Sequence, residues 1–184
     1  MGDNEDMTNE ASEVELSAQD LRVVARYAAE SAQEALSIFE ASHPGDRRPR
    51  AAVEAAWTFA EGAKRTQLQR TSALAAHKAA QEATTDAARD AARAAGHAAA
   101  AAYLHPLAKS TQVKHILGAA AHAARAAELA AGGDRSVGAE RIEQARQRAT
   151  PALVAVLRRY PAAPSSGNRV AELMSALDTS LRSL

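Results

Sequence analysis

The sequence predicts an all-α fold, a single compact antiparallel bundle of about six to seven helices. Alanine, the strongest helix former, makes up about a quarter of the 184 residues. β-Branched residues are sparse, and no stretch keeps the alternation of apolar and polar residues that marks a strand. Because alanine is small, neighbouring helices are expected to pack more closely than the usual 8–10 Å.

The first expected helix covers about residues 17–41. Ser17 and Asp20 form a capping pair at its start, and the motif HPGD at 43–46 ends it. One face carries apolar residues at helical spacing: Leu21, Val24, Ala28, Ala32, Ala35, Leu36 and Phe39.

The second and third expected helices follow directly. The second begins after Asp46, which can cap it, and ends near Gly62. The third covers about residues 64–83. Its expected buried positions are Leu68, Leu74 and Ala75.

The fourth expected helix covers residues 86–103 and is the most alanine-rich. Thr-Thr-Asp at 84–86 supplies its cap, and Pro106 interrupts the chain before a fifth helix that ends near Ala131. The small residues on one side of the fourth helix are Ala88, Ala92, Ala95, Ala99 and Ala102. The inward residues of the fifth are Val113, Ile116, Leu117, Ala120 and Ala124.

Two further helices are expected after the turn Gly-Gly-Asp at 132–134. The first covers about 137–160, with Pro151 predicted to kink or split it. Residues 161–167 form a linker rich in proline and serine, and a short last helix then covers 168–184.

The distribution of charged residues separates an acidic N-terminal segment from a mildly basic remainder. Residues 1–16 contain six acidic residues and no basic one, which predicts a disordered acidic leader; the rest has 22 basic against 16 acidic residues, or +6. The expected organisation is a leader at 1–16, a helical bundle at 17–160, and a linker plus short C-terminal helix at 161–184. A charge of +6 without a dense basic stripe does not favour nucleic acid as a partner.

Several protein classes are disfavoured by what the sequence lacks. There is no cysteine, hence no disulfide and no thiolate metal site. No signal peptide and no membrane-spanning segment is recognisable, so we expect a cytoplasmic protein without a membrane partner. Phosphate-binding loops, dinucleotide fingerprints and nucleophile elbows are absent too, and no cofactor is expected.

A first candidate site lies on the second expected helix. Arg50, Glu54 and Trp57 share one helix face, and Arg47 adds charge near the helix N-terminus, where backbone donors attract anions. This set could bind an anion or a partner's backbone. The alternative is a surface ion pair over a buried indole, and the sequence favours this interpretation.

A second candidate site lies on the third and fourth expected helices. Arg93 and His97 fall four residues apart and form either the lining of a pocket between helices or a solvent-exposed face. His77 is more typical of a packed, hydrogen-bonded residue than of a catalyst. His115 and His122 lie about 10 Å apart along one helix, too far to share a metal ion, so no metal site is expected.

Three segments together resemble a known family. They are DRRPRAAVEAAWTF at 46–59, AAHKAAQEA at 75–83 and AARAAGHAAAAAY at 91–103. The chain is thereby identified as similar to the Imm-5-like immunity proteins, actinobacterial alanine-rich helical proteins. The resemblance covers about residues 18–130, and the chain from about residue 135 onward is an extension.

The resemblance implies an intracellular protein that neutralises a toxin by binding it. The expected binding residues are Arg47, Arg50, Glu54, Trp57, His77, Arg93 and His97. The alternative is a small-molecule-binding or biosynthetic helper protein, in which His97 or His77 acts as an acid–base group in an inter-helix pocket. The residues favour a non-enzymatic protein but leave catalysis open. The partner is a protein toxin or a small molecule, and homo-oligomer formation is also left open.

Overall fold

The computed structural model describes residues 12–164 and 167–184, and in these residues it is helical without any strand. Its helices are α1 (Ala18–Gln33), α2 (Leu36–Ser42), α3 (Arg48–Ala60), α4 (Gln67–Glu82), α5 (Asp86–Ala100), η1 (Ala101–Tyr103), η2 (Ser110–Gln112), α6 (Val113–Ala130), α7 (Arg135–Arg148), α8 (Pro151–Leu157) and α9 (Arg169–Arg182). The all-α prediction is confirmed. The nine α-helices of the described residues exceed the expected six to seven, because two expected helices are each divided.

Most helices begin where a short polar side chain can cap them. Ser17 forms a reciprocal capping box with Asp20, and Thr85 and Asn168 accept hydrogen bonds from the first turns of α5 and α9. Asp46 was expected to cap α3. Its carboxylate does accept a hydrogen bond from the Arg48 backbone, but the residue flanking the helix is Arg47, without a side-chain cap.

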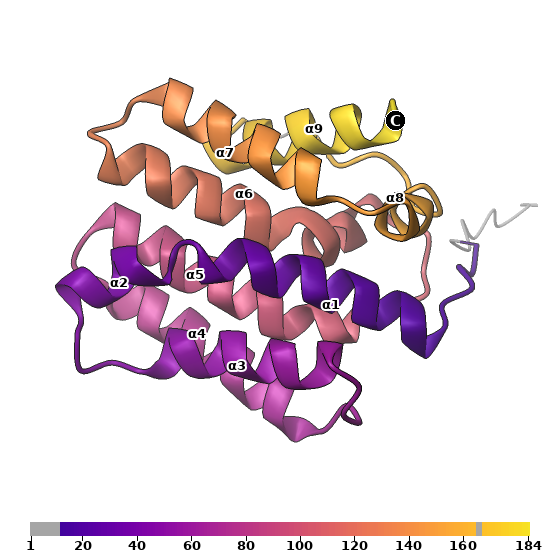
Figure 1. Cartoon of the computed structure of the whole chain (residues 1–184), viewed down its shortest axis with the longest axis horizontal. Coiled ribbons are helices and arrows are strands. Elements are labelled where there is room, and N and C mark those ends of the chain that lie inside the picture. The colour runs from indigo at the N-terminus through magenta and orange to yellow at the C-terminus, as the bar shows by residue number, and fades with distance from the viewer. Residues whose placement is uncertain (1–11, 165–166) are drawn as a thin grey trace, which may run out of the picture.

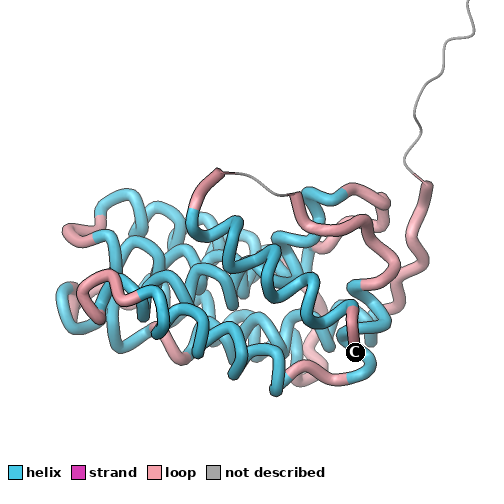
Figure 2. Tube along the Cα trace, turned by 90° about the horizontal axis from the view of Figure 1, so that it is seen from above, coloured by secondary structure: helices cyan, strands magenta, loops and turns pink. Residues whose placement is uncertain are grey.

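The helices lie side by side in successive layers (Figure 1). In this view α3 and α4 lie at the bottom, α1 and α5 in the middle, and α6, α7 and α9 above them. Seen from above, the long helices keep similar directions (Figure 2). The central helix is α5, which packs against α1, α2, α3, α4 and α6.

Small side chains form the interfaces of α5, as expected. All five alanines predicted for one side of α5 and η1 are buried, and so are the five inward residues predicted for α6. Among the larger side chains, Phe39, Ile116, Leu117, Leu153 and Leu177 are fully buried. Among the described residues, no helix combines the length and the apolar character needed to span a bilayer.

Two expectations about helix continuity have different outcomes. The helix expected over 17–41 is in fact two helices, because α1 ends at Gln33 and α2 begins at Leu36. The intervening backbone stays in the right-handed helical region and uses i→i+3 hydrogen bonds, from Ala35 to Ala32 and from Ile38 to Ala35, so the break needs no glycine or proline. Pro151 splits α7 from α8, as predicted.

The predicted core of α4 was wrong. Leu68 and Leu74 are 49% and 63% exposed, and Ala75 is only partly buried. The side of α4 that faces α3 and α5 instead carries the small or polar residues Gln69, Ser72, Ala73, Ala76, Ala79 and Ala80. The close approach of α4 to its neighbours requires small side chains, so the leucines remain on the outer side.

Of the expected acidic leader, residues 1–11 lie outside the described residues. Glu13 forms an isolated β-bridge with Leu107, and Val14 is buried. The chain therefore meets the loop between η1 and η2 just before α1 begins.

Candidate functional site

Three histidines from three neighbouring helices form a row through the centre of the bundle. His77 of α4 meets His97 of α5 edge to face, with 5.4 Å between ring centroids. His97 then stacks on His122 of α6 at 5.0 Å, with 14° between the ring planes. Because α5 packs directly on both α4 and α6, residues far apart in the sequence meet here. We call these three residues the histidine row.

Two glycines make room for the rings. A Cβ atom on Gly96 would lie 2.7–2.9 Å from the His77 ring, and one on Gly118 would lie 3.0–3.4 Å from the His97 ring. Contacts under 3.0 Å force something to move, so the His77 ring in its observed position requires glycine at 96. Gly96 and Gly118 thus replace alanine where a ring crosses between helices.

A carboxylate orients one end of the histidine row. The Asp90 Oδ1 atom lies 2.7 Å from His122 Nδ1, and both side chains are largely buried. This nitrogen therefore donates its proton to Asp90, which fixes the ring orientation. Arg93, one turn further along α5, is 4.0 Å from the same carboxylate.

Burial disfavours the charged form of three histidines of the bundle, His77, His97 and His115. Burial lowers the pKa of His77 and lowers that of His97 well below its usual value, and the positive potential of His122 adds to both shifts. Burial also lowers the pKa of His115, which lies further along α6. These three side chains are consequently neutral at pH 7.

A polar groove opens beside the Asp90 end of the histidine row. It has a volume of about 510 Å³ and lies between α5, α6 and α9. The charged and histidine residues that line it are Asp90, Arg93, Lys114, His122, Arg125 and Arg169. Val170, Ala171 and Met174 of α9 form its apolar wall. We call it the α5–α6–α9 groove.

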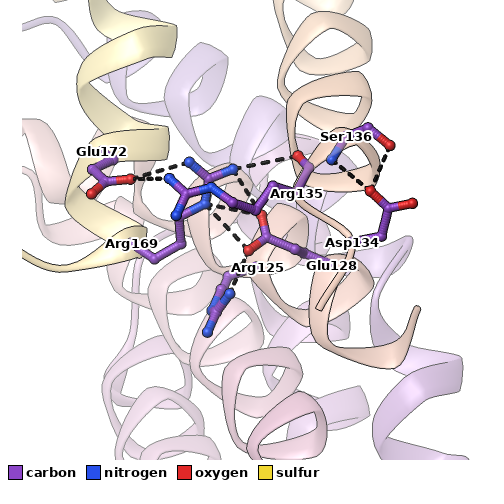
Figure 3. A network of polar contacts seen from close by, with 7 residues as sticks. All are labelled: Arg125, Glu128, Asp134, Arg135, Ser136, Arg169 and Glu172. Carbon is purple, nitrogen blue, oxygen red and sulfur yellow. Dashed lines mark hydrogen bonds and ion pairs between the residues drawn. The ribbon is translucent and has the colours of Figure 1, made fainter. Parts of the chain in front are cut away.

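A buried carboxylate fixes one wall of this groove. Glu128 of α6 is fully buried and accepts hydrogen bonds from Arg125 and from Arg169, the latter at 2.9–3.2 Å (Figure 3). Arg169 also pairs with Glu172, which in turn pairs with Arg135 of α7. The network ties α9 to α6 and α7 through charge-assisted hydrogen bonds.

The structure brings together three of the residues predicted for the site. His77 and His97 belong to the histidine row, and Arg93 lies on the groove rim with 46% of its side chain exposed. Of the two arrangements that the sequence left open, His97 adopts the one between helices and Arg93 the solvent-exposed one. The groove itself is lined by His122 instead of His77 or His97.

The other four predicted residues form a separate set on α3. Arg50 pairs with Glu40 of α2 at 2.7 Å, and Arg47 lies 3.6 Å from Glu54. Trp57 is partly buried and donates its indole N–H to Gln33 of α1. In the described part of the chain, no hydrogen bond or ion pair links this α3 set to the histidine row.

Sequence reasoning missed the residues that complete the site. Asp90 and His122 are 32 positions apart, and Arg169 comes from the extension, so no local spacing connects them. The available indication was the pair of glycines inside alanine-rich helices, where glycine is disfavoured unless a close approach requires it. Among the described residues no group of three histidine or acidic side chains could hold a metal ion.

Comparison with known proteins gives one match. A family model described as "Imm-5 like putative immunity protein" matches residues 15–151, which extends beyond the 18–130 expected from the sequence motifs and includes α7. No curated protein and no solved structure matches the chain. Residues 152–184, which contain α9, lie outside the matched range.

Proposed function

We propose that this chain, which belongs to the Imm-5-like immunity protein family, neutralises a protein toxin by binding to it. The family match is the observation that carries the proposal, because it includes α1 to α7 and so most of the bundle. The neutralising step in this proposal is occlusion: the bundle covers the toxin's working surface and performs no reaction.

The bundle suits occlusion because its charged side chains stand on packed helices. A partner would lose little conformational freedom on binding to such a preorganised surface. Complementary charges would accelerate the encounter and fix the orientation of the two proteins. The two surfaces available for this are the α5–α6–α9 groove with Arg93, and the α3 set of Arg47, Arg50, Glu54 and Trp57.

One residue of the α3 set, Trp57, borders a separate depression. Trp57, Glu30, Gln33, Glu34 and Arg148 line an open depression of about 460 Å³. Arg26 lies over the Trp57 ring, 5.3 Å from its centroid, so the indole is held in place and only partly covered. A partly exposed, fixed tryptophan is a frequent anchor in protein interfaces.

Co-expression tests the proposal. Each protein encoded beside this gene is expressed in a bacterial host, alone and together with this chain. We expect one of them to stop growth, this chain to restore growth, and the two purified proteins to form a complex on a sizing column. A growth-inhibiting neighbour that this chain neither binds nor counteracts would contradict the proposal.

A variant pair assigns the surface. Trp57→Ala removes the α3 anchor, and Arg93→Gln removes a charge from the groove rim. Loss of more than ten-fold in toxin affinity with one variant and not the other identifies the contacting surface. Unchanged affinity with both would show that the toxin contacts neither surface.

The groove supports a second candidate, a small-molecule-binding or biosynthetic helper protein. The specific observation is the Asp90–His122 pair facing a space of about 510 Å³, since a carboxylate-oriented imidazole is suited to binding a polar ligand or moving a proton. Calorimetric titration with small carboxylic acids and phosphate esters tests it. If the chain forms the toxin complex but gives no heat of binding with any of these ligands, the immunity role alone is favoured.

A further inference from the structure

We infer that the α5–α6–α9 groove is the docking site for an acidic segment of the protein partner, and that α9 selects which segment fits. The inference rests on the proposed function and deepens it. It concerns the chemistry of the contact and not the existence of the toxin.

Charge is the first argument. The groove is lined by Arg93, Lys114, Arg125 and Arg169 against the single carboxylate of Asp90. That carboxylate is occupied by His122 at 2.7 Å. The buried carboxylate of Glu128 lies behind the wall and is occupied by Arg125 and Arg169.

Two cations remain available to a ligand. The Arg93 guanidinium lies as far as 4.0 Å from the Asp90 carboxylate, and 46% of the Arg93 side chain is exposed. Lys114 is exposed, and within residues 12–164 and 167–184 it has no carboxylate within 4.0 Å. A carboxylate entering the groove would therefore meet cations that do not first have to leave an internal partner.

The wall that α9 provides is the second argument. Val170, Ala171 and Met174 give the groove an apolar side in addition to its charges. A lone inorganic anion would gain nothing from that wall. A polypeptide with acidic and apolar side chains in alternation would use both walls, and a volume of about 510 Å³ holds a few such side chains.

The origin of α9 is the third argument. Asp90, Arg93, Lys114 and His122 lie within the family match, whereas α9 lies outside it. Three of the four cations, Arg93, Lys114 and Arg125, thus come from the shared helices, whereas Arg169 and the apolar wall come from α9. The Glu128 network holds the two together, so the position of α9 is fixed relative to the cations.

Fluorescence polarisation with two labelled peptides tests the inference on the full chain. The first peptide is Glu-Leu-Asp-Leu-Glu, and the second is its uncharged counterpart Gln-Leu-Asn-Leu-Gln. We expect the acidic peptide to bind at least ten-fold more tightly than the amide peptide. Equal binding of the two, or no binding of the acidic peptide at millimolar concentration, would overturn the inference.

Variants locate the binding. Arg93→Gln with Lys114→Gln should weaken binding of the acidic peptide at least ten-fold, whereas Lys64→Gln with Lys78→Gln removes the same charge from other exposed positions and should leave it within two-fold. Equal weakening by both pairs of substitutions would show that peptide binding depends on the net charge of the protein, and would refute the proposed site.

A second variant tests the α9 wall. Val170→Glu places a carboxylate in the groove near the N-terminus of α9, where a helix tolerates negative charge, and should weaken the acidic peptide at least five-fold. Ala176→Glu, on the exposed side of α9, is the matched control and should have no effect. Equal effects of the two would contradict the role given to α9.

Two further measurements distinguish this inference from a small-anion site and from the proposed function itself. Displacement of the peptide by low-millimolar inorganic phosphate, at constant ionic strength, would identify a small-anion site and overturn the inference. A toxin complex that survives the Arg93/Lys114 and Val170 variants unchanged would reject the groove while leaving the proposed function intact. Peptide binding without any toxin complex would reject the proposed function instead.

Discussion

At the residue scale, two glycines, Gly96 and Gly118, determine whether the histidine row can form. Gly96 and Gly118 lie in alanine-rich helices, and each faces an imidazole ring of the preceding helix. Glycine in a helix interior costs about 1 kcal/mol relative to alanine. That cost is offset here by the space that lets His77 and His97 cross between helices.

Gly96→Ala is expected to destabilise the protein by about 1–2 kcal/mol, because the clash with the His77 ring outweighs the gain in helix propensity. Chemical denaturation measures the change in the free energy of unfolding. His77→Ala in the same chain should recover most of the loss. Gly118→Ala, whose contacts with the His97 ring are wider, should cost less. A stabilised Gly96→Ala variant would disprove the steric account.

The site residues show where sequence reasoning succeeds and where it stops. For His97 the sequence left two arrangements open, between helices or facing solvent, because Arg93 lies four residues before it on the same helix face. Its partners could not be assigned, since His122 and Asp90 come from different helices and their contact depends on the register between α5 and α6. Register is set by packing, which no local spacing reveals.

At the element scale, α9 is attached by two different kinds of contact. Leu173, Leu177 and Leu181 are buried, and α9 packs on α6, α7 and α8. Arg169 joins the same helix to the buried Glu128. The leucines supply most of the attachment energy, and the ion pairs fix the position of α9 along α6 and α7.

Glu128→Gln is expected to destabilise the protein by about 2–4 kcal/mol, since it leaves Arg125 and Arg169 partly buried beside an uncharged amide. Hydrogen exchange should show the largest loss of protection in α9. The control is Glu172→Gln, which removes a half-exposed partner of the same arginine and should cost less than about 1 kcal/mol. Similar losses for both would argue against a special role for the buried carboxylate.

Leu177→Ala is expected to cost about 2–5 kcal/mol, because this fully buried side chain lies between α9 and the rest of the bundle. Leu184→Ala, at an exposed position three residues after the last buried leucine, Leu181, should change the thermal midpoint little. The measurement is thermal unfolding of both variants. If Leu177→Ala unfolds like the parent chain, α9 is not part of the cooperative unit.

The helices themselves were largely predictable, and their buried faces were less so. Capping residues such as Ser17, Thr85 and Asn168 act within one helical turn, so they can be predicted from the local sequence. Leu68 and Leu74 were misplaced because large apolar residues normally mark the core. In α4 the close approach of α3 and α5 reverses that rule, and alanines take the inner face.

At the scale of the whole molecule, the histidines make stability depend on pH. The pKa values of His77, His97 and His115 are lowered in the folded protein, with burial as the first cause, while in the unfolded chain they are near 6.5. The unfolded chain therefore binds more protons than the folded protein below about pH 6.5. The stabilising contribution is complete above that pH and is lost as the pH falls.

We expect the free energy of unfolding to fall between pH 7 and pH 5, by at most about 1.4 kcal/mol per pH unit for each proton taken up. Arg93 and His122 also lower the pKa of His77, and His122 and Lys114 also lower that of His97. Urea titrations at a series of pH values give the slope. His97→Gln should make the slope shallower, and an unchanged slope would show that His97 does not contribute.

The alanine interfaces around α5 also limit how this molecule can vary. Because five helices pack against α5 with methyl groups at the contacts, an enlarged residue at a buried position of α5 has no rotamer to turn into and must displace a whole backbone. Tolerance to substitution should therefore concentrate in the outermost helices. New partner specificities would be expected to arise on α9 and the outer face of α3, while the middle of the bundle stays as it is.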